Sequence, residues 1–294
     1  MPKNPRHLIL NLLLGRGGEP LTASEAVASC ALFGISENST RVALARLAAA
    51  ALVGVAGRGA YVLGPKAAGL AADVALWRGA EQRVIDWSGA WIAVHVAGLG
   101  RSNRAATKAR ERALGLLGLQ AFERGLHLRP DNQVGGVVAV RARLLKLGLE
   151  AEALVFVARD LDPVAEKHAC ALWQGPVLTR HYRDTGQRLA TWLAAAGSLA
   201  PDVAAREAFS LGHDAIRSLV FDPLLPAPLV DVAARREFAD TVARFDAAGH
   251  ALWRRFFDAQ QAGSPPRAAA RGQRLRAGRH PTPETSAGDP HERP

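Results

Sequence analysis

The chain has 294 residues, which is enough for two or three domains, and 49% of them are hydrophobic, so substantial cores are expected. Lysine and arginine number 37 against 27 aspartate and glutamate residues, and the formal net charge of +10 favours a polyanionic partner. The two cysteines lie far apart and have no C-x-x-C partner, which suggests a reducing compartment and no metal site. Neither a signal peptide nor a bilayer-length apolar segment is visible, so we expect a cytoplasmic protein without a membrane partner.

The first 65 residues predict three short helices followed by a β-hairpin. The expected helices span Arg6–Leu14, Thr22–Phe33 and Ser36–Leu47, and the expected strands span Leu52–Val55 and Tyr61–Leu63. In the third helix, four residues at i, i+3, i+4 and i+7 form an apolar stripe: Thr40, Ala43, Leu44 and Leu47. Ser36 is a favoured N-cap because its hydroxyl accepts an N–H of the first turn. This order of elements is typical of a winged helix-turn-helix, a DNA-binding domain that we expect over residues 1–65.

The opposite face of the third helix carries side chains that suit DNA. Its members are Asn38, Ser39, Arg41, Val42, Ala45 and Arg46. Arginine suits guanine edges or phosphate, asparagine suits adenine, and small apolar groups suit the thymine methyl. We therefore expect Arg41 and Asn38 to contact bases, and Arg46 and the hairpin-tip Arg58 to contact phosphates. The alternative is that Arg41 and Arg46 form only the solvated face of an ordinary helix pair.

The middle of the chain alternates strands and helices after a linker helix expected over residues 66–86. The expected strands span Ala90–Ala97, Ala121–Leu128 and Glu152–Ala158, and the expected helices span Arg101–Leu117 and Val134–Leu147. A further strand is expected within residues 119–128 as half of a hairpin. This alternation predicts a ferredoxin-like α+β domain over residues 87–162.

The spacing of apolar residues is helical throughout residues 163–260, which predicts an all-α domain. The expected helices span Val164–Trp173, Arg183–Ala196, Ala204–Phe221 and Ala233–Phe257. Residues 261–294 are rich in Pro, Gly, Ser and Arg, so we expect a disordered basic tail that either attracts phosphates or only keeps the protein soluble. The whole chain is thus predicted to be an α+β multidomain protein.

Three motifs occur in order along the chain. The first is Gly34–Ser36 leading into Thr40–Leu47, the second is Trp87–Trp91, and the third is His213–Arg217 followed by Asp222–Pro226. Together they resemble the PaaX family of transcriptional repressors of phenylacetic acid catabolism, over roughly residues 6–260. The resemblance implies that the central ferredoxin-like domain is similar to Cas2. It also implies a homodimer that binds a palindromic operator in double-stranded DNA and is released by an aryl-CoA thioester such as phenylacetyl-CoA.

The chain departs from the family pattern at two places. Val230–Ala234 stands where the family usually has a W-P-G turn, and the first central strand ends in Val96–Gly98 rather than running into an acidic residue. Both departures concern regions outside the expected DNA-binding helix. They indicate a divergent member whose inducer can differ from that of the family.

A CoA thioester would need cations for its phosphates and an apolar slot for its acyl group. The candidates in the helical domain are Arg180, His181, Arg183, His213 and Arg217, with Trp173, Tyr182 and Trp192 as walls. In the alternative, His213 and Arg217 only anchor the Asp222-Pro223 loop, and the tryptophans belong to the core.

Two other classes of protein are weighed against a regulator. A Cas2-like, metal-dependent nuclease needs a carboxylate at the end of the first central strand, but the chain has none between Val96 and Glu111. The sequence also lacks a Walker loop, a G-x-S-x-G elbow, an H-E-x-x-H motif and metal-like histidine spacing, so no enzyme activity, catalytic residue, metal or cofactor is expected. A nonspecific nucleic-acid-binding protein agrees with the charge alone, and preference for one DNA sequence would distinguish it from a regulator.

Overall fold

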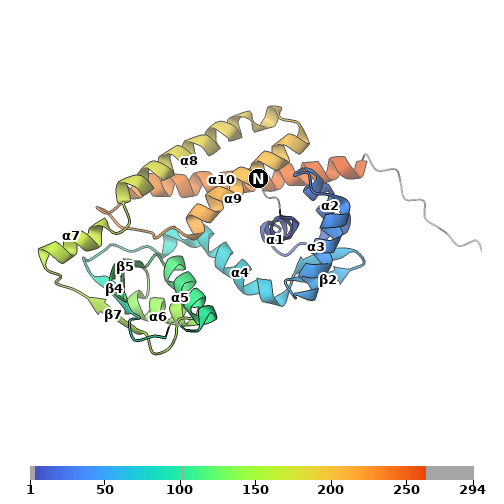
Figure 1. Ribbon diagram of the computed structural model, residues 1–294. Helices are drawn as coiled ribbons and strands as arrows, with labels where there is room; N and C mark the ends of the chain where they lie inside the picture. Colours follow the sequence, from blue (N-terminus) through green and yellow to red (C-terminus); the bar gives the residue numbers. More distant parts are fainter. Residues whose placement is uncertain (1–3, 101, 263–294) are drawn as a thin grey trace, which may run out of the picture.

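The computed structural model describes residues 4–100 and 102–262, which form a mixed α+β structure. Three long helices form one layer: α8 (Gly175–Ala195), α9 (Pro201–Val220) and α10 (Val232–Ala262). Two smaller modules with a sheet each lie on the same side of this layer, toward its two ends (Figure 1). The predicted tail lies outside the described residues from position 263 onward, whereas residues 261 and 262 still belong to α10.

The N-terminal module contains three helices and a small antiparallel sheet. Its elements are α1 (Pro5–Gly15), β1 (Leu21–Thr22), α2 (Ala23–Ala31), α3 (Glu37–Ala49), β2 (Val53–Gly57) and β3 (Ala60–Leu63), and the strand order is β1-β3-β2. The predicted cap is confirmed, because the Ser39 N–H donates to the Ser36 hydroxyl at 3.3 Å. The predicted apolar stripe of α3 is buried throughout. It packs against Leu8, Ile9 and Leu13 of α1. The outer face of α3 is therefore left to the solvent.

The linker is not one helix, so the prediction for residues 66–86 is wrong in this respect. It consists of α4 (Pro65–Ala75) and two short 3-10 turns, Leu76–Gly79 and Glu81–Arg83. The Arg83 guanidinium donates to the carbonyls of Leu76 and Gly79, both at 3.0 Å. These bonds satisfy carbonyls that a continuous helix would have paired internally, and Gly79 has a low helix propensity.

The central module follows the order strand, helix, two strands, helix, strand. Its elements are β4 (Trp91–His95), α5 (Arg104–Leu116), β5 (Gln120–Glu123), β6 (Leu126–Pro130), α6 (Gly136–Lys146) and β7 (Leu154–Ala158). The sheet is antiparallel with the order β5-β6-β4-β7. The single strand predicted over Ala121–Leu128 is a hairpin instead, which confirms the further strand expected there. It turns at Gly125, whose φ of +77° suits glycine.

The predicted helix over Arg101–Leu117 begins three residues later, because Asn103 caps it. The Asn103 side chain accepts the N–H groups of Ala105 and Ala106 at 3.0 and 3.1 Å. Both faces of the sheet behind this helix pack against other elements, although Leu154 and Phe156 of the edge strand β7 are exposed. Alternate residues such as Ile92 and Val94 pack under α5 and α6, while Trp91 and Ala93 face the helical layer. The central module is thereby attached to the rest of the chain through an apolar contact.

The remaining helices occur where they are predicted, but several boundaries differ: α9 begins three residues earlier than expected, and α10 ends five residues later. They are α7 (Pro163–Ala171), α8, a 3-10 turn (Ala196–Ser198), α9 and α10. The helix predicted from Arg183 begins at Gly175, because Pro176 stands in the first turn, where the missing N–H breaks no helical hydrogen bond. Gly175 is required there, since a Cβ atom would lie 1.7 Å from the Leu229 carbonyl oxygen. The start of α8 therefore lies directly against the segment that precedes α10.

Candidate nucleic-acid interface and effector site

The residues assigned to DNA lie on the exposed side of α3 and on the hairpin tip. Asn38, Ser39, Arg41, Val42, Ala45, Arg46 and Arg58 are all exposed. Val42 is 41% exposed and adds an apolar group to this surface. For the members on α3, the arrangement follows from the helical period, which turns them away from the buried stripe of the same helix.

Two members of this surface have partners that the sequence analysis did not name. The Arg41 guanidinium forms an ion pair with Glu37 at 2.6 Å, and both side chains are about 60% exposed. Such an i,i+4 pair on a surface stabilises by only about 0.3–0.5 kcal/mol, so Arg41 can leave it for a base or a phosphate. The i,i+4 spacing of Glu37 and Arg41 in the sequence is the signal that could have predicted this pair. The Ser39 hydroxyl accepts a hydrogen bond from Ser36 at 2.9 Å and belongs to the helix cap.

The N-terminal module is held by the long helices. Phe256 and Phe257 of α10 belong to the same apolar core as α1 and α3. His213 of α9 lies 3.3 Å from the Asn11 side-chain amide and stacks on Phe209. Burial lowers the pKa of His213. His213 thus contacts α1 and its own helix α9, and neither contact places it in an effector pocket or makes it an anchor for the Asp222-Pro223 loop.

The five predicted effector residues do not converge on one pocket. Arg180 and Arg183 line an open groove of about 530 Å³ between the start of α8 and the segment Pro228–Asp231. In contrast, His181 is hydrogen-bonded to Ser218 at 3.1 Å, and the Arg217 guanidinium lies over the Phe221 ring at 5.2 Å. Because neighbouring helix residues point in different directions, only the pair at i and i+3 shares the groove.

The groove combines cationic and apolar groups. Arg183 donates to Asp231 at 2.5 Å. The rest of the lining is Gly175, Pro176, Thr179, Asp184, Pro228, Leu229 and Val230. Sequence reasoning missed these residues, although Val230 and Asp231 lie where the chain departs from the family pattern. The three aromatic residues proposed as walls lie elsewhere: Trp173 and Tyr182 are buried in the main core, and Trp192 packs against it. The core alternative is therefore correct for them.

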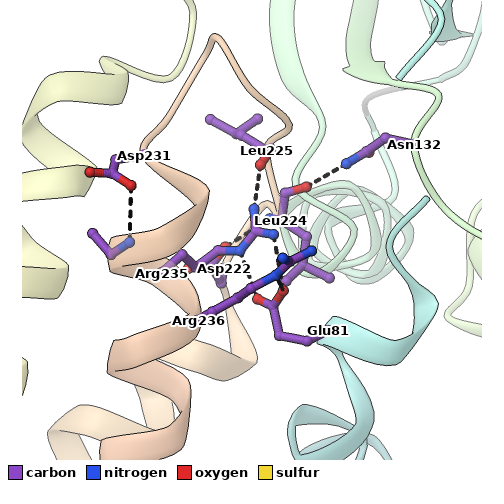
Figure 2. A network of polar contacts seen from close by, with 9 residues as sticks. Glu81, Asn132, Asp222, Leu224, Leu225, Asp231, Arg235 and Arg236 are labelled. Atoms are coloured by element: carbon purple, nitrogen blue, oxygen red, sulfur yellow. Dashed lines mark hydrogen bonds and ion pairs between the residues drawn. The ribbon is translucent and has the colours of Figure 1, made fainter. Parts of the chain in front are cut away.

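A polar junction next to the groove joins three parts of the chain (Figure 2). The fully buried Arg235 of α10 donates to both carboxylate oxygens of Glu81 in the linker, at 2.7 and 3.1 Å, and to the Leu225 carbonyl. Asn132 of the central module, also fully buried, donates to the Leu224 carbonyl at 2.7 Å. The loop Asp222–Pro226 thus contacts the central module and α10 directly, and Arg235 of α10 joins it to the linker.

The charged groups of this junction are strongly affected by burial. Burial raises the pKa of the Asp222 carboxyl, which accepts the Leu224 N–H at 2.7 Å. Burial also raises the pKa of the neighbouring Tyr182 hydroxyl, and the Asp222 carboxyl beside it raises this pKa further. In the central module, burial lowers the pKa of Arg129 to about 10. Its guanidinium donates to Asn132 at 3.2 Å. These side chains hold the parts of the chain in place.

Among the described residues, no helix combines the length and the apolar character needed to cross a membrane. Within residues 4–100 and 102–262, no group of three or more His, Cys, Asp and Glu side chains is placed to hold a metal ion.

Comparison with known proteins identifies the helical part of the chain. Residues 173–255 match the model of the PaaX-like protein C-terminal domain. The matched residues include the groove and the loop Asp222–Pro226. A solved structure, the uncharacterized protein Rv0674 from Mycobacterium tuberculosis, is similar with 25% identity and a TM-score of 0.52, over 84% of this chain and 99% of that chain. No curated protein matches the chain. Residues 173–255 of the chain therefore form a PaaX-like C-terminal domain.

Proposed function

We propose that this protein is a sequence-specific, DNA-binding transcriptional regulator that acts as a homodimeric repressor on a palindromic operator. The observation that carries the proposal is α3, a capped helix with one face buried and the other face made of exposed arginine, asparagine and small residues. A helix of this kind fits the major groove, and a basic hairpin tip beside it suits the phosphate backbone. The PaaX-like C-terminal domain supports the same function.

The proposal assigns a role to each part of the chain. Residues 1–65 are a winged helix-turn-helix domain, residues 66–86 a linker, residues 87–162 a ferredoxin-like, Cas2-like domain, and residues 163–260 a helical domain. The strand order β5-β6-β4-β7 and the antiparallel pairing support the ferredoxin-like assignment. In this view the N-terminal domain reads the operator, and the other domains contribute the dimer contacts and the response to a ligand.

We further propose that an aryl-CoA thioester releases the repressor from genes of aromatic-acid catabolism by binding in the groove at Arg180 and Arg183. The groove offers two guanidinium groups for phosphates beside an apolar wall at Pro228–Val230. Asp231, which pairs with Arg183, also accepts the N–H of Ala234 at 3.0 Å, next to the Arg235 that holds Glu81. A ligand that competes for Arg183 would therefore act on the first turn of α10 and on the linker.

Fluorescence anisotropy tests this proposal. The full chain is titrated onto the duplex upstream of its own gene and onto a shuffled duplex, at near-physiological salt, with and without phenylacetyl-CoA. A regulator is expected to prefer the upstream duplex by about 10³-fold or more. Equal, weak binding to both duplexes would contradict sequence specificity. Binding that phenylacetyl-CoA leaves unchanged would keep the regulator and reject this effector.

Two sets of variants assign the roles within the same assay. Arg41→Ala is expected to weaken binding to the preferred duplex by about 1–3 kcal/mol and to relax the preference at one base position. Equal weakening on all sequences would contradict base contact by Arg41. The double variant Arg180→Ala/Arg183→Ala is expected to raise the thioester concentration needed for release. Arg188→Ala/Arg244→Ala removes two exposed arginines outside the groove, is the matched control and is expected to leave that concentration unchanged.

A further inference from the structure

The central module carries more positive charge than the DNA-binding domain proposed above. Residues 87–162 contain 11 Lys and Arg against 7 Asp and Glu, a net charge of +4, whereas residues 1–65 contain 6 against 3, a net charge of +3. Residues 163–260, which include the long helices, contain 11 of each and are neutral. If only α3 and the hairpin contact DNA, the positive charge of the central module has no role.

Much of this charge is arranged as a row along α5. Arg104, Lys108 and Arg112 are exposed and stand at i, i+4 and i+8, on one side of the helix. Four residues of a helix rise by about 6 Å, so the row is about 12 Å long. Within the described part of the chain, none of the three forms an ion pair, and Glu111 is the one carboxylate of α5. The row is a strip of unneutralised positive charge.

The rotation of α5 is set by its buried side. The fourth basic residue, Arg110, is buried and forms an ion pair with Glu150. Ala113 and Leu114 pack with the core beneath the sheet face. These contacts stop the helix from turning its basic row toward the protein. The packing of α5 therefore holds the row on the solvent side of the helix.

We propose that the basic row of α5 binds the phosphate backbone of the same DNA duplex that α3 reads. This inference rests on the proposed function. The N-terminal module and α5 lie on the same side of the neutral layer of long helices, with α4 leading from one to the other (Figure 1). A duplex extends well beyond the few base pairs that one helix covers, so its flank is available to a second cationic surface. Phosphate contacts of this kind fix position and carry no sequence information of their own.

The length of the preferred DNA follows from this proposal. Contacts by α5 would lie outside the base pairs that α3 reads, so they add affinity only on a duplex that is long enough to reach α5. They would add equally to preferred and shuffled sequences, because a phosphate is the same in both. A basic row would also suit an acidic protein. If the row binds an acidic protein instead of DNA, removing its charges is expected to leave DNA binding unchanged.

The salt dependence of DNA binding measures these contacts. Anisotropy titrations of the full chain with 40-base-pair upstream and shuffled duplexes, between 50 and 200 mM NaCl, yield the slope of log Kobs against log [NaCl]. The variant Arg104→Ala/Lys108→Ala/Arg112→Ala is expected to lower the magnitude of this slope by about 2 to 3, since each lost contact contributes about 0.9. The loss is expected on both duplexes and is expected to shrink on a duplex trimmed to the core site.

A matched variant controls for net charge. Lys167→Ala/Arg188→Ala/Arg244→Ala removes three exposed cations from α7, α8 and α10 and is expected to leave the slope unchanged. The conservative variant Arg104→Lys/Arg112→Lys is expected to keep the wild-type slope and shows that the charge is what matters. Circular dichroism verifies that each variant is folded.

Each outcome decides between the claims. A wild-type slope in the α5 alanine variant overturns the inference, and it leaves the regulator in place if Arg41→Ala still weakens binding. An equal loss in both triple variants also overturns it, because the effect would then come from total charge. Absence of wild-type binding to either duplex overturns the proposed function and the inference together.

Discussion

The ion pair between Arg235 and Glu81 offers the sharpest test of how the linker is held. Replacing Arg235 with methionine keeps most of the side-chain volume and removes the charge. The change deletes two bonds to the Glu81 carboxylate, at 2.7 and 3.1 Å, and one to the Leu225 carbonyl. Arg235 has no exposed surface, and the Glu81 side chain is 25% exposed. The variant therefore leaves a largely buried carboxylate with fewer partners.

Removal of one member of a buried ion pair costs about 3–5 kcal/mol. The lower end applies to Arg235→Met, because Glu81 keeps some contact with water and a second arginine, Arg236, at 3.5 Å. The reverse change, Glu81→Gln, is expected to cost more, at about 4 kcal/mol, since it leaves a fully buried guanidinium without its counter-ion. The double variant is expected to be less destabilised than the sum of the two by about 2 kcal/mol.

Urea unfolding followed by tryptophan fluorescence measures these values, because Trp77, Trp91 and Trp173 belong to the core around the junction. With an m-value of about 3 kcal/mol/M, Arg235→Met is expected to lower the midpoint by about 1 M. The control is Arg236→Met, which changes an arginine that contacts the same carboxylate but is 62% exposed, and it is expected to cost less than about 1 kcal/mol. Equal midpoints for the two methionine variants would refute the reasoning.

Two further predictions concern the same junction. Gly118 has a φ of +68°, and a Cβ atom there would lie 2.7 Å from the Pro223 Cα atom, so Gly118→Ala is expected to lower the melting temperature. Gly115→Ala, at an open position of α5, is the control and is expected to stabilise by up to about 1 kcal/mol; a comparable loss in both would contradict the first prediction. Burial raises the folded-state pKa of Asp222, so the stability linked to this group is full below its unfolded pKa of about 4 and is lost as the pH rises toward the folded pKa. Asp222→Asn removes this loss and keeps an acceptor for the Leu224 N–H. The unfolding free energy of the variant relative to the wild type is therefore expected to increase from pH 4 to pH 7. Urea titrations that yield parallel pH profiles for the two proteins would argue against a raised pKa of Asp222.

The local pattern of the sequence determines most of the elements and the exposed face of α3. Ser36 caps the helix because its hydroxyl lies three residues before the N–H that it accepts, and Thr40 to Leu47 form a stripe because they repeat with the helical period. Interactions within about five residues need no knowledge of the rest of the chain. Errors occurred where an element boundary depends on a distant contact, as at Gly175, which lies against Leu229.

The candidate effector site and the junction were decided by the tertiary structure. Arg235 meets Glu81 across 154 positions, and His213 meets Asn11 across 202. No spacing rule connects such pairs, because which helix faces meet depends on how the apolar sides of α8, α9 and α10 pack around one another. That packing placed Arg180 and Arg183 in a groove and turned His181, His213 and Arg217 to other surroundings. The sequence by itself determined the kinds of residue available for binding, and the packing of the long helices decided which of them share a site.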